Sequence, residues 1–237
     1  MADIEVVLID TSKDNLNKGL KRIKNILSFN VEKGLIEKEL ADDIFSKINP
    51  SQDYSQIKDC DLIIEAVFEE RDLKAKVIKE SEKHMKKSAI FASNTSTISI
   101  NELNHFSSSP ENFIGIHFFS PVDRMELVEI IKTKKTSAKT LSCVYDFIRK
   151  INKTPIIVND SPGFYTTRVF EKYTCEGLAL LYEGYPAHLI ESTSKKVGFP
   201  IGPLAVLDEI NIELALKIRK EIGSNLYSQK SENHLEP

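Results

Sequence analysis

Short apolar runs and longer amphipathic stretches alternate along the first two thirds of the chain. The apolar runs are rich in β-branched residues, a pattern typical of buried strands. They fall at residues 4–9, 62–66, 89–92, 113–118, 127–131 and 156–158. Strands that alternate with helices indicate βαβ units, so we expect an α/β domain built on a parallel sheet.

The stretches between the apolar runs have helical spacing. Four leucine and isoleucine residues, at positions 16, 20, 23 and 27, fall on one face of a helix that the Thr-Ser pair at 11–12 can cap. Leu40, Ile44 and Ile48 mark a second helix, expected to stop at Asn49-Pro50. Further helices are predicted at 69–85 and 137–150.

The pattern changes after residue 159. Three helical stretches follow, and glycine and proline residues separate them. They lie at residues 164–182, 186–196 and 204–222. The sequence therefore predicts two domains, an α/β domain at 1–159 and a helical domain at 160–237.

Composition and charge exclude several classes of protein. The net charge of −3 gives no electrostatic case for binding nucleic acid or anionic membranes. No apolar run is long enough to span a bilayer, and the N-terminus has no secretory pattern, so a cytoplasmic protein is expected. Cys60, Cys143 and Cys175 are too few and too widely spaced for a disulfide framework or a zinc site. We expect them to be buried, and no metal is predicted.

Asp10 ends the first predicted strand. In a dinucleotide-binding fold, an acid at the end of the second strand accepts hydrogen bonds from the adenosine ribose, which favours NAD over NADP. The alternative is a helix cap. The glycine loop G-x-G-x-x-G is expected about 20 residues before such an acid. Only nine residues precede Asp10 and none is glycine, so either the assignment is wrong or the chain begins late.

His117 and Glu129 lie on two successive predicted strands, twelve positions apart. A carboxylate bound to one ring nitrogen orients an imidazole and stabilises its protonated form. The other nitrogen can then take a hydroxyl proton while a hydride leaves the same carbon. The alternative, which spacing alone favours, is a solvent-facing histidine and an unrelated surface glutamate.

Three more polar residues lie near predicted strand ends. Ser96 follows the strand at 89–92, where open α/β sheets place their ligands. Its hydroxyl can bond a substrate oxygen, although serine is also an ordinary turn residue. Glu69 and Lys74 open the helix after the strand at 62–66, where a solvated helix face is the usual reading.

Six segments together resemble the L-3-hydroxyacyl-CoA dehydrogenase family, and most closely the dehydrogenase part of the multifunctional fatty-acid oxidation α-subunits. The segments are IEVVLIDTS, DLIIEAVFEERDLKAKV, ASNTSTISI, IGIHFFSPVDRMELVEII, VNDSPGF and VGFPIGPLAVLDE. They occur in the family's order, and the HFFSP, LVEII and SPGF blocks are specific. They argue against a different two-domain NAD enzyme.

The resemblance implies an activity and a role for each matching residue. The family oxidises L-3-hydroxyacyl-CoA to 3-ketoacyl-CoA with NAD, in fatty-acid β-oxidation, and commonly forms homodimers through its helical domain. His117 would be the catalytic base, Glu129 its orienting partner, and Ser96 a contact of the substrate and of NAD. The positions that would line the NAD site are Asp10, Val67, Phe68, Glu69, Lys74 and Ser120, and Thr167 would contact the substrate.

The chain also departs from the family pattern. Ser120 and Thr167 stand where the family often has asparagine, so each keeps a hydroxyl but loses the amide. Met1 falls where the family's first helix ends, and the chain stops soon after Ile222. The resemblance therefore implies a Rossmann-type sheet without its first strand and glycine loop, followed by a partial helical domain. We expect weak NAD binding, and the alternative function is an impaired remnant that at most binds acyl-CoA.

Overall fold

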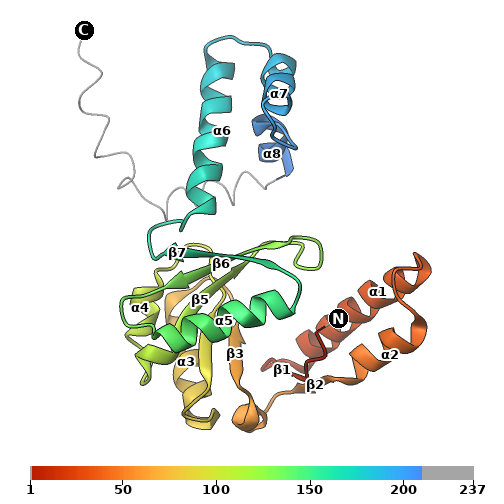
Figure 1. Ribbon diagram of the computed structural model, residues 1–237, viewed down its shortest axis with the longest axis vertical. Helices are drawn as coiled ribbons and strands as arrows, with labels where there is room; N and C mark the ends of the chain where they lie inside the picture. The colour runs from red at the N-terminus through yellow and green to blue at the C-terminus, as the bar shows by residue number, and fades with distance from the viewer. Residues whose placement is uncertain (1, 210–237) are drawn as a thin grey trace.

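The computed structural model describes residues 2–209. Its main sheet has five strands in the order β3-β4-β5-β6-β7. Their bounds are Leu62–Glu65 for β3, Ile90–Ser93 for β4, Phe113–Phe118 for β5, Leu127–Lys132 for β6 and Thr154–Asn159 for β7. Together with the helices around them, these strands confirm the α/β fold class (Figure 1).

The sheet is parallel from β3 to β5, but β6 runs antiparallel to β5, and β7 runs parallel to β6. The expectation of a parallel sheet therefore fails at this one pairing. The reason is the length of the connection at residues 119–126, which is too short for the crossover that a parallel neighbour requires. The reversal places residues of β5 and β6 directly opposite each other.

A separate two-stranded parallel sheet joins β1 (Val6–Ile9) to β2 (Ile48–Ser51). Between them come α1 (Lys13–Glu32) and α2 (Lys38–Ser46). Within residues 2–209, β1 pairs only with β2, and β3 pairs only with β4. One edge of β1 and one edge of β3 are therefore unpaired within the described residues.

Ile48 corrects one sequence prediction, because it begins β2 and does not belong to α2. The helix ends at Ser46, and backbone bonds from Val6 to Lys47 and from Asp10 to Ser51 recruit the next residues into a ladder with β1. Pro50 has no amide hydrogen and is tolerated because β2 is an edge strand.

Helices cover both faces of the main sheet. On one face, α3 (Arg71–His84) and α4 (Ile100–Asn104) pack with Phe91, Phe113 and Ile131. On the other face, α5 (Ala138–Lys150) contributes Val144 and Ile148 to a second core. Two short 3-10 helices connect elements, η1 at Tyr54–Asp59 and η2 at Pro110–Asn112.

Three helices follow β7 and stand apart from the sheet (Figure 1). They are α6 (Thr166–Tyr182), α7 (Ala187–Lys196) and α8 (Pro203–Glu209). Their packing is close, since a Cβ on Gly177 of α6 would lie 2.5 Å from Pro203. The predicted third helix begins within the described residues, and its positions from 210 lie outside them. The division between residues 159 and 160 stays a prediction.

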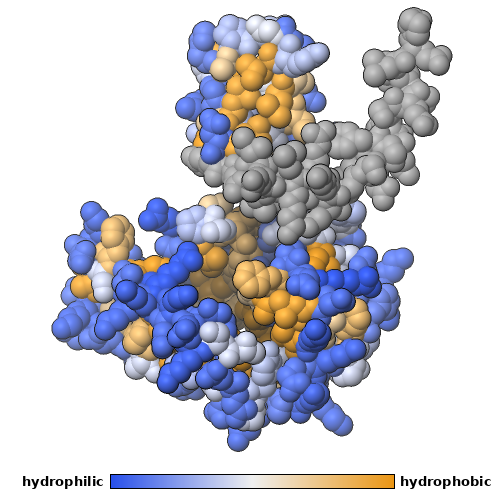
Figure 2. All heavy atoms as spheres, turned by 180° about the vertical axis from the view of Figure 1, so that it is seen from behind, coloured by the Kyte–Doolittle hydropathy of each residue, from blue (hydrophilic) through white to orange (hydrophobic). Residues whose placement is uncertain are grey.

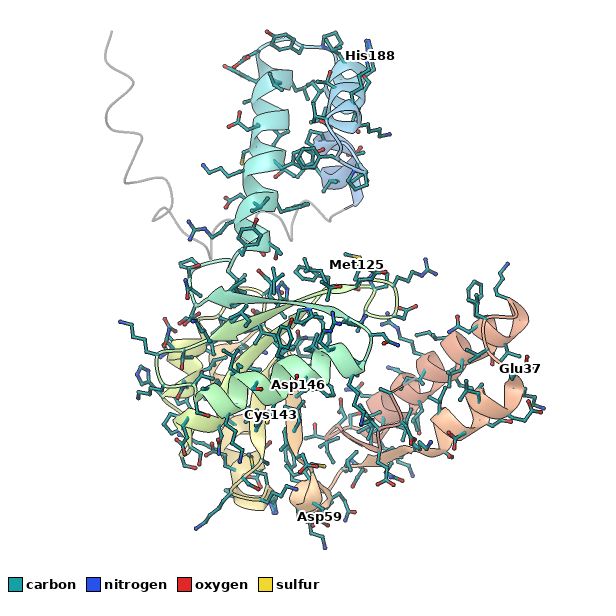
Figure 3. All side chains as sticks on the ribbon, in the orientation of Figure 1. Glu37, Asp59, Met125, Cys143, Asp146 and His188 are labelled. Atoms are coloured by element: carbon teal, nitrogen blue, oxygen red, sulfur yellow. The ribbon has the colours of Figure 1, made fainter. Side chains whose placement is uncertain are left out.

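Apolar side chains gather on one face of this helical unit (Figure 2). The exposed large apolar residues of α6 include Leu178, Leu181 and Tyr182, and Tyr182 is 95% exposed. His188 lies on α7 at the end of the unit far from the sheet (Figure 3).

The cysteines differ from expectation. Cys143 is exposed on α5, and Cys60 and Cys175 are only half-buried, so none is a core residue (Figure 3). None of the three forms a disulfide within residues 2–209. Within residues 2–209, no helix is long and apolar enough to cross a membrane, and no three His, Cys, Asp or Glu side chains are grouped so that they could hold a metal ion.

Candidate active site

His117 and Glu129 form the centre of the site. The antiparallel register pairs them directly across β5 and β6, where opposite side chains start only about 5 Å apart. Nδ1 of His117 lies 2.7 Å from Oε2 of Glu129. The histidine is 6% exposed and the glutamate is fully buried. The alternative of two unrelated surface residues is wrong.

The start of α6 completes the surroundings of Glu129. The amides of Tyr165 and Thr166 donate to Oε1 at 3.0 and 2.8 Å, and the Thr166 hydroxyl donates to Oε2 at 2.8 Å. The positive end of the helix dipole also favours an anion here. Burial acts to raise the pKa of Glu129, but hydrogen bonds from His117 and Thr166 outweigh it and hold the pKa below its ordinary value. The group is therefore a carboxylate at neutral pH.

The hydroxyl of Ser96 contacts the other ring nitrogen of His117, Nε2. Ser96 follows β4, and its Oγ lies 3.0 Å from Nε2 of His117. The rings of Phe119 and Phe164 flank the imidazole, with centroids 4.4 and 6.0 Å away. Phe164 reaches this place through a backbone turn in which both it and Gly163 have positive φ, at 46° and 69°. The Glu129 carboxylate thus fixes the imidazole at Nδ1, and a hydroxyl group lies within hydrogen-bond distance of Nε2.

Lys74 and Glu69 lie next to the loop at residues 94–98, which carries Ser96 and is called the Ser96 loop. They do not lie on a solvated helix face. Lys74 is 0% exposed, and its Nζ donates to Glu65 Oε1 at 2.8 Å and to the Asn94 carbonyl at 3.0 Å. Glu69 Oε1 accepts from the amide of Ser96 at 2.9 Å. The solvated-face reading is wrong, because each charge is satisfied inside the protein.

The carboxyl end of β3 presents the predicted cofactor segment. Val67 is half-buried, and its amide donates to Glu65 Oε1 at 2.7 Å. Phe68 is 85% exposed. Because β3, β4 and β5 are parallel neighbours, this segment, Ser96 and His117 lie at the same edge of the sheet: the first two follow their strands, and His117 is the next-to-last residue of β5. Open α/β sheets bind their ligands at that edge.

Asp10 lies apart from these residues, at the end of β1 in the two-stranded sheet. Its Oδ1 accepts from the Ser12 amide at 2.8 Å, and Asn15 Nδ2 lies 3.3 Å from Oδ1 and 3.5 Å from Oδ2. The residue that caps α1 is Ser12, whose hydroxyl accepts from the Asn15 amide at 3.4 Å, so Asp10 is not the helix cap that the alternative proposed. The carboxylate itself is half-buried.

Ser120 lies in the loop between β5 and β6, and Thr167 lies at the start of α6. Ser120 is exposed in the loop after β5 and precedes a cis bond to Pro121. Thr167 is half-buried in the first turn of α6, next to Thr166, which binds Glu129.

Sequence reasoning missed two residues of this site. Glu65 is buried beneath Lys74 and also accepts from the Ser93 hydroxyl at 2.7 Å. The sequence did hold a signal for Glu65, because it is a charged residue within an apolar run, LIIEAV at residues 62–67. Thr166 had no such signal, because its role depends on where α6 begins relative to β6.

A cavity of about 430 Å³ lies elsewhere, between α5 and the strands β3 and β4. Leu62, Ile90, Cys143 and Phe147 are among its lining residues. It touches none of the residues predicted for the active site.

Comparisons with known proteins agree with this geometry. Residues 1–161 match the family model of the 3-hydroxyacyl-CoA dehydrogenase NAD binding domain, and residues 163–237 match the model of its C-terminal domain. The chain belongs to the 3-hydroxyacyl-CoA dehydrogenase family. The resemblance read from the sequence is thereby confirmed, as is NAD as the cofactor of the family.

Individual relatives point the same way. The chain is 38% identical over 226 residues to the fatty acid oxidation complex subunit alpha of Shewanella halifaxensis; the match covers 94% of the chain but only 32% of that relative. Among solved structures, (S)-3-hydroxybutyryl-CoA dehydrogenase from Ralstonia eutropha is 33% identical with a TM-score of 0.90, over 96% of this chain and 80% of that one. The 3-hydroxybutyryl-CoA dehydrogenase of Escherichia coli K12 is 26% identical with a TM-score of 0.91, over 97% and 49%.

Proposed function

We propose that this dehydrogenase-family chain oxidises an L-3-hydroxyacyl-CoA to the 3-ketoacyl-CoA with NAD, as a step of fatty-acid β-oxidation. One observation carries the proposal: the imidazole of His117 lies between the Glu129 carboxylate at 2.7 Å and the Ser96 hydroxyl at 3.0 Å. Oxidation of a secondary alcohol needs a base for the hydroxyl proton, and this imidazole is oriented as one.

The protein's own groups account for the proton. Glu129 accepts the Nδ1 hydrogen of His117, which leaves the lone pair of Nε2 directed toward Ser96. A substrate hydroxyl beside Ser96 gives its proton to Nε2, and the ionised carboxylate stabilises the imidazolium that forms. NAD, when bound, supplies the hydride acceptor for the hydrogen on the same carbon.

The residues present are compatible with a dinucleotide at the carboxyl edge of the sheet. Support comes from the Asp10 carboxylate at the end of β1, a group that suits ribose hydroxyls, and from the exposed Phe68 beside Val67. Ser96 and Ser120 would lie toward the nicotinamide end. Glu69 and Lys74 belong to this region, although their own bonds point inward.

The substrate is proposed as an acyl-CoA because the family and the relatives act on that class. Ser96 and Thr167 would contact it, since one bonds to the catalytic histidine and the other lies in the helix turn that holds Glu129. A homodimer through the helical unit is proposed as well, and the exposed apolar residues of α6 are compatible with it.

The test is formation of reduced nicotinamide by the purified chain with NAD and an L-3-hydroxyacyl-CoA. His117→Ala should lower kcat by about 100- to 10,000-fold, the contribution of a general base. His188→Ala is the matched control, because His188 is exposed on α7 far from the sheet (Figure 3). Activity that survives in the His117 variant would refute the assignment, and a wild type that binds acyl-CoA without turnover would favour the non-enzymatic alternative.

A further inference from the structure

Lys74 is a fully buried cation whose partners all lie around the Ser96 loop. Its Nζ lies 2.8 Å from Glu65 Oε1, 3.0 Å from the Asn94 carbonyl and 3.5 Å from Glu69 Oε2. A buried ammonium is tolerated only when such partners replace its water. Because Asn94 begins the loop that carries Ser96, the lysine ties α3 to the base of that loop.

Glu65 forms a buried ion pair with Lys74. Its side chain is also 0% exposed. Oε1 accepts from Lys74 and from the Val67 amide, and Oε2 accepts from the Ser93 hydroxyl at 2.7 Å. Ser93 is the last residue of β4, so this carboxylate joins the ends of two neighbouring strands.

Glu69 holds the loop itself. Its Oε1 accepts from the hydroxyl of Thr95 and from the amides of Ser96 and Thr97 at 2.9 Å each. Burial acts to raise the pKa of Glu69, but these bonds and the charge of Lys74 outweigh it and lower the pKa. A single carboxylate oxygen of Glu69 thus accepts hydrogen bonds from three successive residues of the loop.

The loop is joined on its other side to the strand of the catalytic histidine. Asn94 Oδ1 accepts from the amide of Phe118 at 3.1 Å, next to His117 on β5. The Ser96 hydroxyl then meets His117 Nε2 at 3.0 Å. A shift of the loop by about 1 Å would break this contact, and such a displacement can cost about 100-fold in rate.

We propose that Glu65, Lys74 and Glu69 are positioning residues that hold the Ser96 hydroxyl against His117, and that their role is in turnover more than in gripping NAD. The inference rests on the proposed dehydrogenase function. It differs from the cofactor role that the family resemblance implied for Glu69 and Lys74.

The test is a double-mutant cycle on kcat with Ser96→Ala and Glu69→Ala. Glu69→Ala should lower kcat by up to about 100-fold, with a much smaller change in KM for NAD. In the Ser96→Ala background, the same substitution should cost less than about threefold, because the group it positions is gone. Glu69→Gln keeps the shape of the side chain and one acceptor, and should fall between wild type and Glu69→Ala.

Glu80→Gln is the control, a carboxyl-to-amide change at a half-buried position of the same helix, where the side chain bonds to Lys83 and His84 and not to the loop. A rise in KM for NAD at unchanged kcat would overturn the proposal in favour of a direct cofactor contact. Additive losses in the cycle would overturn it in favour of a purely structural role. Failure of the proposed function itself is distinguishable, because the wild-type chain would then form no reduced nicotinamide.

Discussion

The bond between Glu129 on β6 and Thr166 on α6 joins the proposed catalytic pair to the helical part of the chain. Thr166 donates its amide to Oε1 at 2.8 Å and its hydroxyl to Oε2 at 2.8 Å, while His117 occupies Oε2 at 2.7 Å. The orientation of the histidine therefore depends on where α6 begins. Two parts of the sequence, 37 positions apart, meet at one carboxylate.

Replacing Thr166 with alanine tests this connection. Thr166→Ala removes the hydroxyl donor to a buried carboxylate and should cost about 1.5–3 kcal/mol of unfolding free energy. It should also lower kcat several-fold through the misaligned histidine, and Thr166→Ser should restore both. Urea unfolding and steady-state kinetics measure the two effects. Thr193→Ala, at an exposed position of α7, should leave both unchanged.

Acid sensitivity should follow from Glu129. Its pKa in the folded protein is held below the ordinary value, so its ionised form adds stability above the unfolded-state pKa of about 4.3. That stability is lost as the pH falls through the folded-state pKa. Unfolding free energy measured against pH should therefore fall less steeply below about pH 4.3 in Glu129→Gln than in wild type.

Glu37→Gln provides the comparison for that pH series. Glu37 is exposed at the start of α2 and its side chain makes no capping hydrogen bond (Figure 3). Its variant should show the wild-type slope. Equal slopes for wild type and Glu129→Gln would contradict the prediction.

Gly115 should tolerate no side chain. A Cβ there would lie 2.6 Å from Cγ1 and 2.7 Å from Cδ1 of Ile100, because α4 packs closely over β5. Gly115→Ala should destabilise the protein by about 1–3 kcal/mol, the usual cost of overpacking a core. Thermal or urea unfolding measures the loss.

Gly19→Ala is the matched control for Gly115. Gly19 lies within α1, and its added Cβ would be 3.8 Å from the nearest atom, on Leu8. The variant should be more stable by about 0.5–1 kcal/mol, since alanine favours a helix. If both variants behaved alike, the close approach at Gly115 would not be the cause.

Asp160 should stabilise α4 from a distance in sequence. Its carboxylate accepts from the Ser99 hydroxyl at 2.8 Å and from the amides of Ile100 and Asn101 at 3.0 and 2.7 Å. Asp160→Ala should cost about 0.5–2 kcal/mol, as the loss of a helix cap does. Asp146→Ala, at an exposed position of α5, should cost nothing by the same unfolding measurement (Figure 3).

Most elements followed from local pattern. The strands at Leu62–Glu65 and Phe113–Phe118 and the helix at Ala138–Lys150 lie within a few residues of their predictions, because burial imposes a period on each segment. Ile48 did not follow, since its helical spacing was overridden by the ladder with β1. The antiparallel direction of β6 was not predicted either. It follows from the connection at residues 119–126, which is too short for a parallel crossover.

The candidate residues divide in the same way. His117, Glu129 and Ser96 could be named because the residues and the family resemblance both indicated them, yet spacing alone favoured an unrelated pair. Lys74 was expected on a solvated face, and only its position over Glu65 explains its burial. A buried charge is decided by its partner, and the partner is nine residues away on another element.

The amino-acid sequence by itself indicated the family, the candidate reacting groups and most of the strands and helices, because these depend on residue type and local spacing. It did not indicate β2 or α4. The tertiary structure decided which of those groups touch. An antiparallel register set His117 against Glu129, the start of α6 completed the carboxylate's hydrogen bonds, and a buried lysine fixed the serine loop. Such contacts join residues distant in sequence, and their geometry exists only once the chain has closed on itself.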